Sequence, residues 1–247
     1  MSSEKSKDTK QICEKHGEVL QIISWGDRSF PGSCKQCRAE ADKKEILQLE
    51  KHHTDAKLRA IANQAKIPER YKLASLSQLK PVCPNARKNI LVAERYIADF
   101  EENLEMGRCM ILSGGVGTGK THTACSIARE VINRGYRARY TRFPSMMREI
   151  KATYGTDENG KESQVISEFT WPHLLVVDEI GIGYGTPYEE NTFSDIMAER
   201  YDNLKPTILI SNLDFAAIER SIGDRNMSRM VDRGGFILNY DWESYRC

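Results

Sequence analysis

Short apolar runs alternate with amphipathic stretches through the last two thirds of the chain. The runs CMILSG, ARYTRF, HLLVVDEI and TILISNL begin at residues 109, 138, 173 and 207, and a helical pattern follows each of them. Strands that alternate with helices are typical of a parallel sheet with helices packed on it. The pattern therefore predicts an α/β fold over residues 87–247, opened by the helix-forming stretch ARKNILVAERYIADFEENL.

The first third of the chain has a different pattern. Residues 38–66 are rich in helix formers with only loose apolar periodicity, which predicts a long, largely solvated helix. Within it, residues 41–66 are interpreted as a spacer or as an arm that binds a partner. Residues 67–86 contain three prolines and few strong periodicities, so they are expected to form a linker, with the domain boundary near Ile67.

Composition and charge restrict the class of protein. The 247 residues include 36 Lys and Arg against 35 Asp and Glu, for a net charge of +1, so nucleic acid contacts must come from local patches. No apolar run approaches the roughly 18 residues of a membrane span, and residues 1–30 lack a signal-peptide core. We expect a cytoplasmic protein with no membrane partner.

Four potential metal ligands lie close to the N-terminus. The spacing of CEKH and CKQC, which hold Cys13, His16, Cys34 and Cys37, is typical of a zinc site. Residues 1–40 are too short to bury a core of their own, and a tetrahedral ion would stabilise them. The alternative is scattered thiols and a surface histidine. The other cysteines are interpreted as structural or incidental, namely Cys83, Cys109, Cys125 and Cys247.

The stretch GGVGTGKTH lies between an apolar run and a helical pattern, which is the context of a phosphate-binding loop. Backbone N–H groups and the start of the helix would hold phosphates, Lys120 would reach the terminal phosphates, and Thr121 would ligate Mg²⁺. The alternative is a simple glycine turn. The expected ATP-binding residues are Gly114, Gly115, Val116, Gly117, Thr118, Gly119, Lys120, Thr121 and His122.

Polar side chains follow two other apolar runs. Asp178 and Glu179 end LLVVDE, at the edge of a parallel sheet where ligands bind. We expect Asp178 to hold Mg²⁺ and Glu179 to orient or activate a water, the alternative being a helix cap. Asn212 ends TILISN, on a strand expected beside the first, and is a candidate partner of that water or of the terminal phosphate; Asn also starts turns.

The stretch DRNMSRMVDRGG places Arg225, Arg229 and Arg233 at helical spacing on one predicted face. Three cations on one face indicate either a solvated surface or a guanidinium that is presented to a nucleotide bound by a neighbouring copy. Arg246 follows DWESY near the C-terminus.

Taken together, GGVGTGKTH, LLVVDEIG, ILISN, GDRNMSRM and NYDWESYR resemble the helicase-loader branch of the AAA+ ATPases, the bacterial and phage DnaC-like proteins. The resemblance runs from about residue 67 to the end. The related transposition-accessory ATPases of the IstB type share IPERY and the core motifs. The resemblance implies an AAA+ P-loop core that lacks a complete C-terminal lid.

The resemblance also implies roles for individual residues. Lys120 and Thr121 correspond to Walker A, and Asp178 and Glu179 to Walker B. Asn212 corresponds to sensor 1, Arg229 to the arginine finger and Arg246 to sensor 2. Loaders of this kind line single-stranded DNA with residues at four positions, here Lys151, Tyr154, Thr186 and Tyr188. Cations suit phosphates and rings suit bases, although ordinary surface tyrosines are the alternative for Tyr154 and Tyr188.

The function expected from this resemblance is an ATP-dependent loader that uses Mg²⁺ and delivers a hexameric replicative helicase onto single-stranded DNA. Bound Zn²⁺ is expected from the Cys/His spacing alone. An arginine acting across an interface requires a homo-oligomer, and an open spiral is expected. The location is a bacterial cytoplasm, with a prophage as one source of the gene. The Cys/His segment departs from better-known loaders and leaves open whether it contacts helicase or DNA. The alternatives are a transposition-accessory ATPase, a zinc-dependent DNA-binding protein with a vestigial nucleotide site, and a P-loop small-molecule kinase.

Overall fold

The computed structural model describes residues 12–20, 22–25, 28–153, 161–181 and 186–245. The chain divides into two compact units, Met1–Ala56 and Lys57–Cys247. This division precedes the boundary that the sequence places near Ile67, and the four predicted domain ranges stay a prediction. Among the described residues, no helix is long and apolar enough to cross a membrane.

The first unit contains a two-stranded antiparallel sheet of β1 (Ile22–Trp25) and β2 (Arg28–Pro31). The helix α1 (Lys35–Gln64) follows and spans both units, close to the predicted residues 38–66. Residues 38–54 of this helix are all exposed, including Ile46, Leu47 and Leu49. A helix of this composition has no apolar stripe to bury, so the predicted solvated helix is confirmed.

The second unit is built on a five-stranded parallel sheet with the order β4-β5-β6-β3-β7. The four predicted strands are present, and the predicted parallel α/β fold is confirmed. A fifth strand at the sheet edge, which the apolar pattern did not reveal, pairs with β3. The strands are β3 (Met110–Gly114), β4 (Ala138–Arg142), β5 (Leu174–Asp178), β6 (Thr207–Ser211) and β7 (Phe236–Tyr240).

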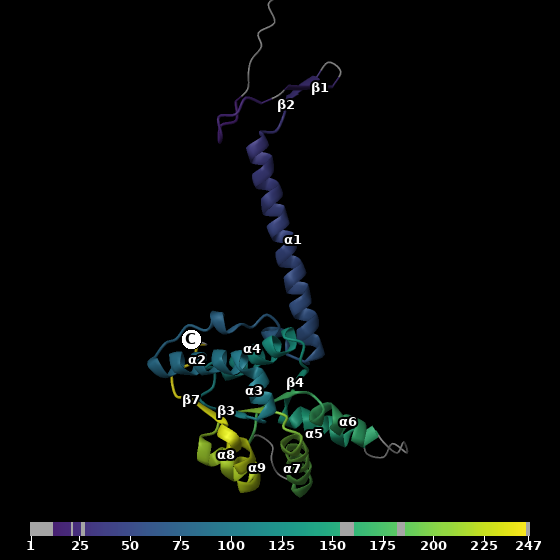
Figure 1. Cartoon of the computed structure of the whole chain (residues 1–247), viewed down its shortest axis with the longest axis vertical. Coiled ribbons are helices and arrows are strands. Elements are labelled where there is room, and N and C mark those ends of the chain that lie inside the picture. The colour runs from purple at the N-terminus through teal and green to yellow at the C-terminus, as the bar shows by residue number, and fades with distance from the viewer. Residues whose placement is uncertain (1–11, 21, 26–27, 154–160, 182–185, 246–247) are drawn as a thin grey trace, which may run out of the picture. The chain divides into compact units, whose positions relative to one another are not determined.

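Helices cover both faces of this sheet (Figure 1). One face packs against α2 (Pro84–Ala98) and α4 (Lys120–Asn133), and its core includes Leu112 and Val176. The other face has a separate core that includes Ile111 and Val177, because side chains alternate along each strand. The remaining helices are α3 (Phe100–Glu105), α5 (Phe143–Lys151), α6 (Lys161–Thr170), α7 (Pro187–Asp202), α8 (Phe215–Ile222) and α9 (Asp224–Val231).

Residues 67–86, expected to be a linker, contain two short 3-10 helices, η1 (Glu69–Tyr71) and η2 (Leu76–Gln78), and their last three residues belong to α2. Ile67 and Leu76 are 3% and 7% exposed and belong to the core beneath α4. Apolar burial at these positions fixes the segment on the second unit. It therefore lies beside the start of α4.

The prediction that three arginines share one helical face is wrong for the last of them, Arg233. Helix α9 ends at Val231, and the chain continues through the 3-10 helix η3 (Asp232–Gly234). Arg233 has a left-handed backbone with φ of 57°. The turn is tight at Gly235, where a Cβ would lie 2.0 Å from the Met230 carbonyl oxygen. Arg225 and Arg229 share α9, whereas Arg233 does not.

One buried arginine of the second unit, unlike Arg129 and Arg139, has no carboxylate among its described hydrogen-bond acceptors. Arg200 of α7 is 1% exposed, and burial lowers the pKa of its guanidinium to about 10. Its N–H groups donate to the carbonyl oxygens of Phe169, Pro172 and Pro206 at 2.6 to 2.9 Å and to the Thr207 hydroxyl at 2.9 Å. This guanidinium joins the end of α6 to the starts of β5 and β6.

Candidate nucleotide site

The phosphate-binding loop connects β3 to α4 and is stabilised by the edge strand. Gly114 has φ of 127°, and a Cβ there would lie only 2.2 Å from the Tyr240 carbonyl oxygen of β7. The amide of Gly115 donates to that same oxygen at 3.1 Å. Glycine is therefore required at the first position of the loop by both backbone conformation and space.

Lys120 is the first residue of α4 and is 5% exposed. Its ammonium donates to the carbonyl oxygens of Gly114 and Gly115 at 2.7 and 2.5 Å, and the Thr118 hydroxyl donates to Gly115 at 2.8 Å. Gly119 caps the helix with φ of 99°. A cation and a helix N-terminus thus meet in one loop, which is an arrangement that binds phosphate.

Asp178 at the end of β5 is 8% exposed and accepts three hydrogen bonds. Its Oδ2 accepts from the Thr121 hydroxyl and from the Tyr140 hydroxyl, each at 2.9 Å, and its Oδ1 accepts from the Glu179 amide at 2.8 Å. The predicted pair Thr121 and Asp178 is thus in direct contact. Tyr140 was not predicted, because a tyrosine within an apolar strand is indistinguishable from an ordinary core residue.

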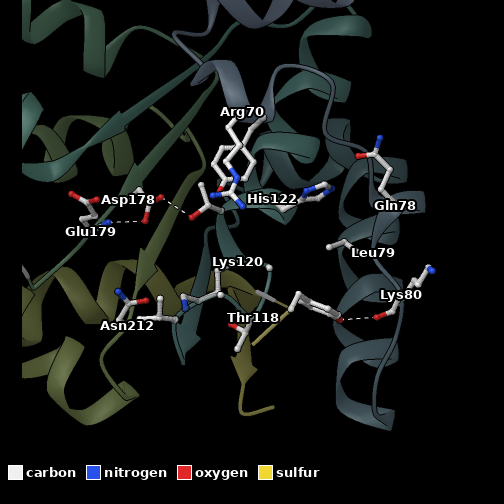
Figure 2. Close-up of a pocket in the computed structure, with 16 residues that line it drawn as sticks. Arg70, Gln78, Leu79, Lys80, Thr118, Lys120, His122, Asp178, Glu179 and Asn212 are labelled. Carbon is white, nitrogen blue, oxygen red and sulfur yellow. Dashed lines mark hydrogen bonds between the residues drawn. The ribbon is translucent and has the colours of Figure 1, made fainter. Parts of the chain in front are cut away.

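Glu179 follows with a left-handed backbone, φ of 62°. Its carboxylate lies 3.5 Å from the guanidinium of Arg142, the last residue of the neighbouring strand β4. Figure 2 shows the Glu179 carboxylate pointing away from Lys120. Asn212 follows β6, which neighbours β5, so the predicted juxtaposition of the two strand ends is correct.

The loop and the strand ends enclose one pocket of about 530 Å³ (Figure 2), which Gly114 and Gly115 of the expected ATP-binding residues do not line. The predicted residues that line it are Val116, Gly117, Thr118, Gly119, Lys120, Thr121, His122, Asp178, Glu179 and Asn212. Sequence reasoning missed a second group of lining residues, which are Arg70, Tyr71, Gln78, Leu79, Lys80 and Tyr245. Most of these come from the supposed linker, where only the stretch IPERY gave a signal.

Three hydrogen bonds join these unpredicted segments to the loop, to the start of α4 and to each other. His122 Nε2 lies 2.8 Å from the Ser75 carbonyl oxygen. Tyr245 donates from its amide to the Gly117 carbonyl at 3.0 Å and from its hydroxyl to the Lys80 carbonyl at 2.7 Å. The residues just before Arg246 therefore lie directly on the phosphate-binding loop. Arg246 itself lies outside the described residues.

Arg229 is half-buried on α9 and does not line this pocket. Its guanidinium donates to the Asn226 side chain at 3.1 Å and lies 6.0 Å from the centre of the Tyr201 ring. Within a single chain, Arg229 does not reach the pocket beside the phosphate-binding loop. A role toward nucleotide would therefore require the site of another copy.

The predicted DNA-contacting residues gather where α5 ends and α7 begins. Lys151 forms an ion pair with Glu189 at 2.7 Å, and the Thr186 hydroxyl caps α7 by accepting from the Glu189 amide at 3.3 Å. The Tyr188 hydroxyl donates to Glu162 at 3.3 Å. Tyr154 lies outside the described residues.

The Cys/His cluster in the first unit brings its four ligand atoms within 4.8 Å of one another. His16 presents Nδ1 to the sulfurs of Cys37, Cys34 and Cys13 at 3.3, 3.6 and 3.9 Å. Its other ring nitrogen, Nε2, lies 3.2 Å from Glu40. Such a carboxylate fixes the ring orientation of a ligating histidine.

Residues 40–246 match the family described as IstB-like ATP binding protein. The chain belongs to this family. The match includes every predicted nucleotide-binding residue of this IstB-like protein and begins after the Cys/His cluster.

Relatives of this chain include proteins named replicative helicase loader DnaC. The chain is 29% identical over 190 residues to the replicative helicase loader DnaC of Buchnera aphidicola subsp. Schizaphis graminum, covering 77% of this chain and 76% of the relative. It is 26% identical over 198 residues to DnaC of Escherichia coli K12, covering 80% and 79%. The fold is similar to a crystal structure of the DnaC helicase loader, with a TM-score of 0.61, 22% identity, and 70% and 100% coverage. The predicted AAA+ fold and the DnaC-like resemblance are confirmed.

Proposed function

We propose that this IstB-like protein is an ATP-hydrolysing helicase loader, which binds a replicative helicase and delivers it onto single-stranded DNA. The observation that carries the proposal is the similarity to relatives named replicative helicase loader over about three quarters of each chain. The intact nucleotide pocket supports it. A DNA-binding protein with a vestigial nucleotide site would have no need to retain Lys120, Asp178 and Glu179 in one pocket.

The pocket residues fit ATP with Mg²⁺. Gly117 and Gly119 of the loop line the pocket with positive φ, Lys120 supplies a buried cation, and Thr121 and Asp178 supply the oxygen donors that Mg²⁺ prefers. When bound, the metal ion neutralises charge on the phosphates.

Each protein group has a separate part in hydrolysis. Lys120 binds the terminal phosphates, Glu179 orients or activates the attacking water, and Asn212 hydrogen-bonds to the water or the terminal phosphate. Because the Glu179 carboxylate is paired with Arg142, it must exchange that partner to act in the pocket. ATP then works as a switch, with the bound form favouring one arrangement of protomers and slow hydrolysis releasing the partner.

Within one chain, Arg229 lies outside the nucleotide pocket. In an assembly of several copies, each pocket would receive this arginine from a neighbouring copy. Arg229 of one copy would stabilise charge on the nucleotide of the next, and a head-to-tail interface that does not close produces an open spiral. The cluster of Lys151, Thr186 and Tyr188 would face single-stranded DNA, where a cation tracks phosphates and a ring stacks on bases.

Replacing Arg229 by Ala is expected to leave nucleotide affinity near wild type and to lower ATP-dependent assembly, or to lower turnover by about 1,000-fold, because a trans arginine acts only in the assembled state. Sedimentation with and without ATP, together with phosphate release, measures both effects. Arg95→Ala, at a guanidinium that is 82% exposed on α2, is the matched control. If the Arg229 variant assembled and hydrolysed ATP like wild type, the alternative that this arginine is only part of a solvated surface would be correct.

The cluster of Cys13, His16, Cys34 and Cys37 is proposed to hold Zn²⁺. Three sulfurs and an imidazole nitrogen within 4.8 Å match the donor set of a structural zinc site. Such an ion would stabilise residues 1–40, which otherwise have little core. The sequence leaves open whether this module contacts the helicase or DNA.

Replacing Cys34 by Ser is expected to remove about one equivalent of zinc per chain and to unfold the N-terminal module, because the site needs all four ligands. Native mass spectrometry measures the metal, and proteolysis of residues 1–40 measures the unfolding. Cys83→Ser is the control, since Cys83 caps α2 in the second unit. Unchanged zinc content in the Cys34 variant would contradict the site.

The loader proposal is tested with the full-length protein, the replicative helicase of the same bacterium, ATP and a circular single strand. We expect the amount of helicase on the circle to rise several-fold with the wild-type chain and to stay at background with Lys120→Ala, because the variant lacks the phosphate-binding cation. No effect of the wild-type chain on loading would refute the proposal.

A transposition-accessory ATPase is the second candidate, because the matching family is described as IstB-like. It would use the same nucleotide residues and choose a different partner. Capture of a transposase in place of the helicase, from lysate with ATP, distinguishes the two.

A further inference from the structure

We infer that Tyr140 is a positioning residue for the magnesium site, through the hydrogen bond that its hydroxyl donates to Asp178. The inference rests on the proposed ATP-binding function of the same pocket. Tyr140 lies on β4, two residues before Arg142, which is the register partner of Asp178 on β5. Its side chain thus reaches the neighbouring strand end from within the sheet.

The hydrogen bonds around Asp178 leave little freedom to this carboxylate. Tyr140 and Thr121 both donate to Oδ2 at 2.9 Å, while the Glu179 amide holds Oδ1 at 2.8 Å. Of these donors, the Thr121 hydroxyl is itself a proposed metal ligand and the amide belongs to the backbone. Among the described hydrogen-bond donors to Asp178, Tyr140 is therefore the one side chain that positions the carboxylate and is not itself a proposed metal ligand.

The phenol is suited to a permanent donor role. Tyr140 is 5% exposed, and the ordinary pKa of a phenol is about 10. The hydroxyl consequently stays protonated at any physiological pH. It also has a fixed backbone, because the Tyr140 amide donates to the Ala65 carbonyl at 2.7 Å and the ring belongs to the core beneath α4.

Loss of this donor affects the carboxylate more than the fold. In Tyr140→Phe the ring still fills its place in the core, whereas Asp178 loses one of two donors to Oδ2. Partners that orient metal-ligating carboxylates typically contribute about 10-fold to 100-fold to metal affinity or activity. We therefore expect that a higher Mg²⁺ concentration is needed to support nucleotide binding and hydrolysis, whereas the phosphate-binding loop stays intact.

The experiment titrates Mg²⁺ into the full-length protein with a fluorescent ATP analogue and records both analogue binding and ATP hydrolysis. For Tyr140→Phe we expect the Mg²⁺ concentration at half-effect to rise about 10-fold. Analogue affinity in EDTA should match wild type, and saturating Mg²⁺ should restore most of the hydrolysis. Tyr96→Phe is the matched control, because this buried hydroxyl donates to the Arg108 carbonyl at 2.9 Å, away from the pocket.

The outcomes separate the two proposals. Wild-type Mg²⁺ dependence in Tyr140→Phe, or a hydrolysis defect that saturating Mg²⁺ does not relieve, overturns the positioning role. A wild-type protein that neither binds nor hydrolyses ATP overturns the proposed function instead. Thermal unfolding in EDTA monitors the fold, and equal shifts in both Phe variants assign any stability loss to the buried hydroxyl alone.

Discussion

Replacing Glu179 by Gln is expected to lower ATP hydrolysis by about 100-fold or more while nucleotide binding stays near wild type. The amide keeps the size of the side chain but cannot accept a proton from water. It also loses the ion pair with Arg142, which lies 3.5 Å from the carboxylate. Binding is retained because Lys120 and the loop amides, rather than Glu179, contact the phosphates in the proposed site.

Equilibrium binding of a fluorescent ATP analogue and steady-state phosphate release measure the two effects separately. Glu105→Gln, at an exposed position near the end of α3, makes the same chemical change outside the pocket. Turnover at the wild-type rate in the Glu179 variant would refute its role toward water. Loss of binding together with hydrolysis would instead assign Glu179 to holding the nucleotide.

Replacing Arg200 by Leu is expected to lower the free energy of unfolding by several kcal/mol, at about 1 to 3 kcal/mol for each buried acceptor that is left unsatisfied. The guanidinium is the described donor for the carbonyls of Phe169, Pro172 and Pro206, and leucine leaves these buried acceptors without it. The effect is structural, since these groups lie at the starts of β5 and β6 and the nucleotide pocket is at the opposite strand ends.

Urea unfolding of the full-length protein measures this loss, with Arg95→Leu on the exposed face of α2 as the control. Arg200→Lys should fall between the two, because it retains the charge but not the fork of N–H donors. A Leu variant as stable as wild type would mean that apolar packing replaces the guanidinium contacts without cost.

The residues that the proposed nucleotide pocket shares with the sequence prediction could be named in advance because their chemistry is local in sequence. Lys120 and Thr121 adjoin in the loop, and Asp178 and Glu179 end an apolar run that only a buried strand explains. The juxtaposition of Asn212 with these groups followed from parallel strands ending at one sheet edge. The spacing of the Cys and His residues was likewise enough to predict that the four candidate metal ligands lie close together.

The rest of the pocket depends on tertiary contacts that no local pattern encodes. Arg70 and Leu79 come from a proline-containing stretch without periodicity, and they reach the pocket only because Ile67 and Leu76 bury against the core beneath α4. The edge strand β7 was missed because its short run follows two glycines and an arginine-rich stretch. Arg233 was misplaced because the helix ended before it.

The contact of β7 with the phosphate-binding loop has a consequence for protein synthesis. The Gly115 amide bonds to the carbonyl of Tyr240, a residue that is translated 120 positions after Lys120. At typical elongation rates of about 5 to 20 residues per second, the loop waits roughly 6 to 24 s on the ribosome for the strand that shapes it. Nascent chains therefore cannot form the contact between the phosphate-binding loop and β7 until this strand has been synthesised.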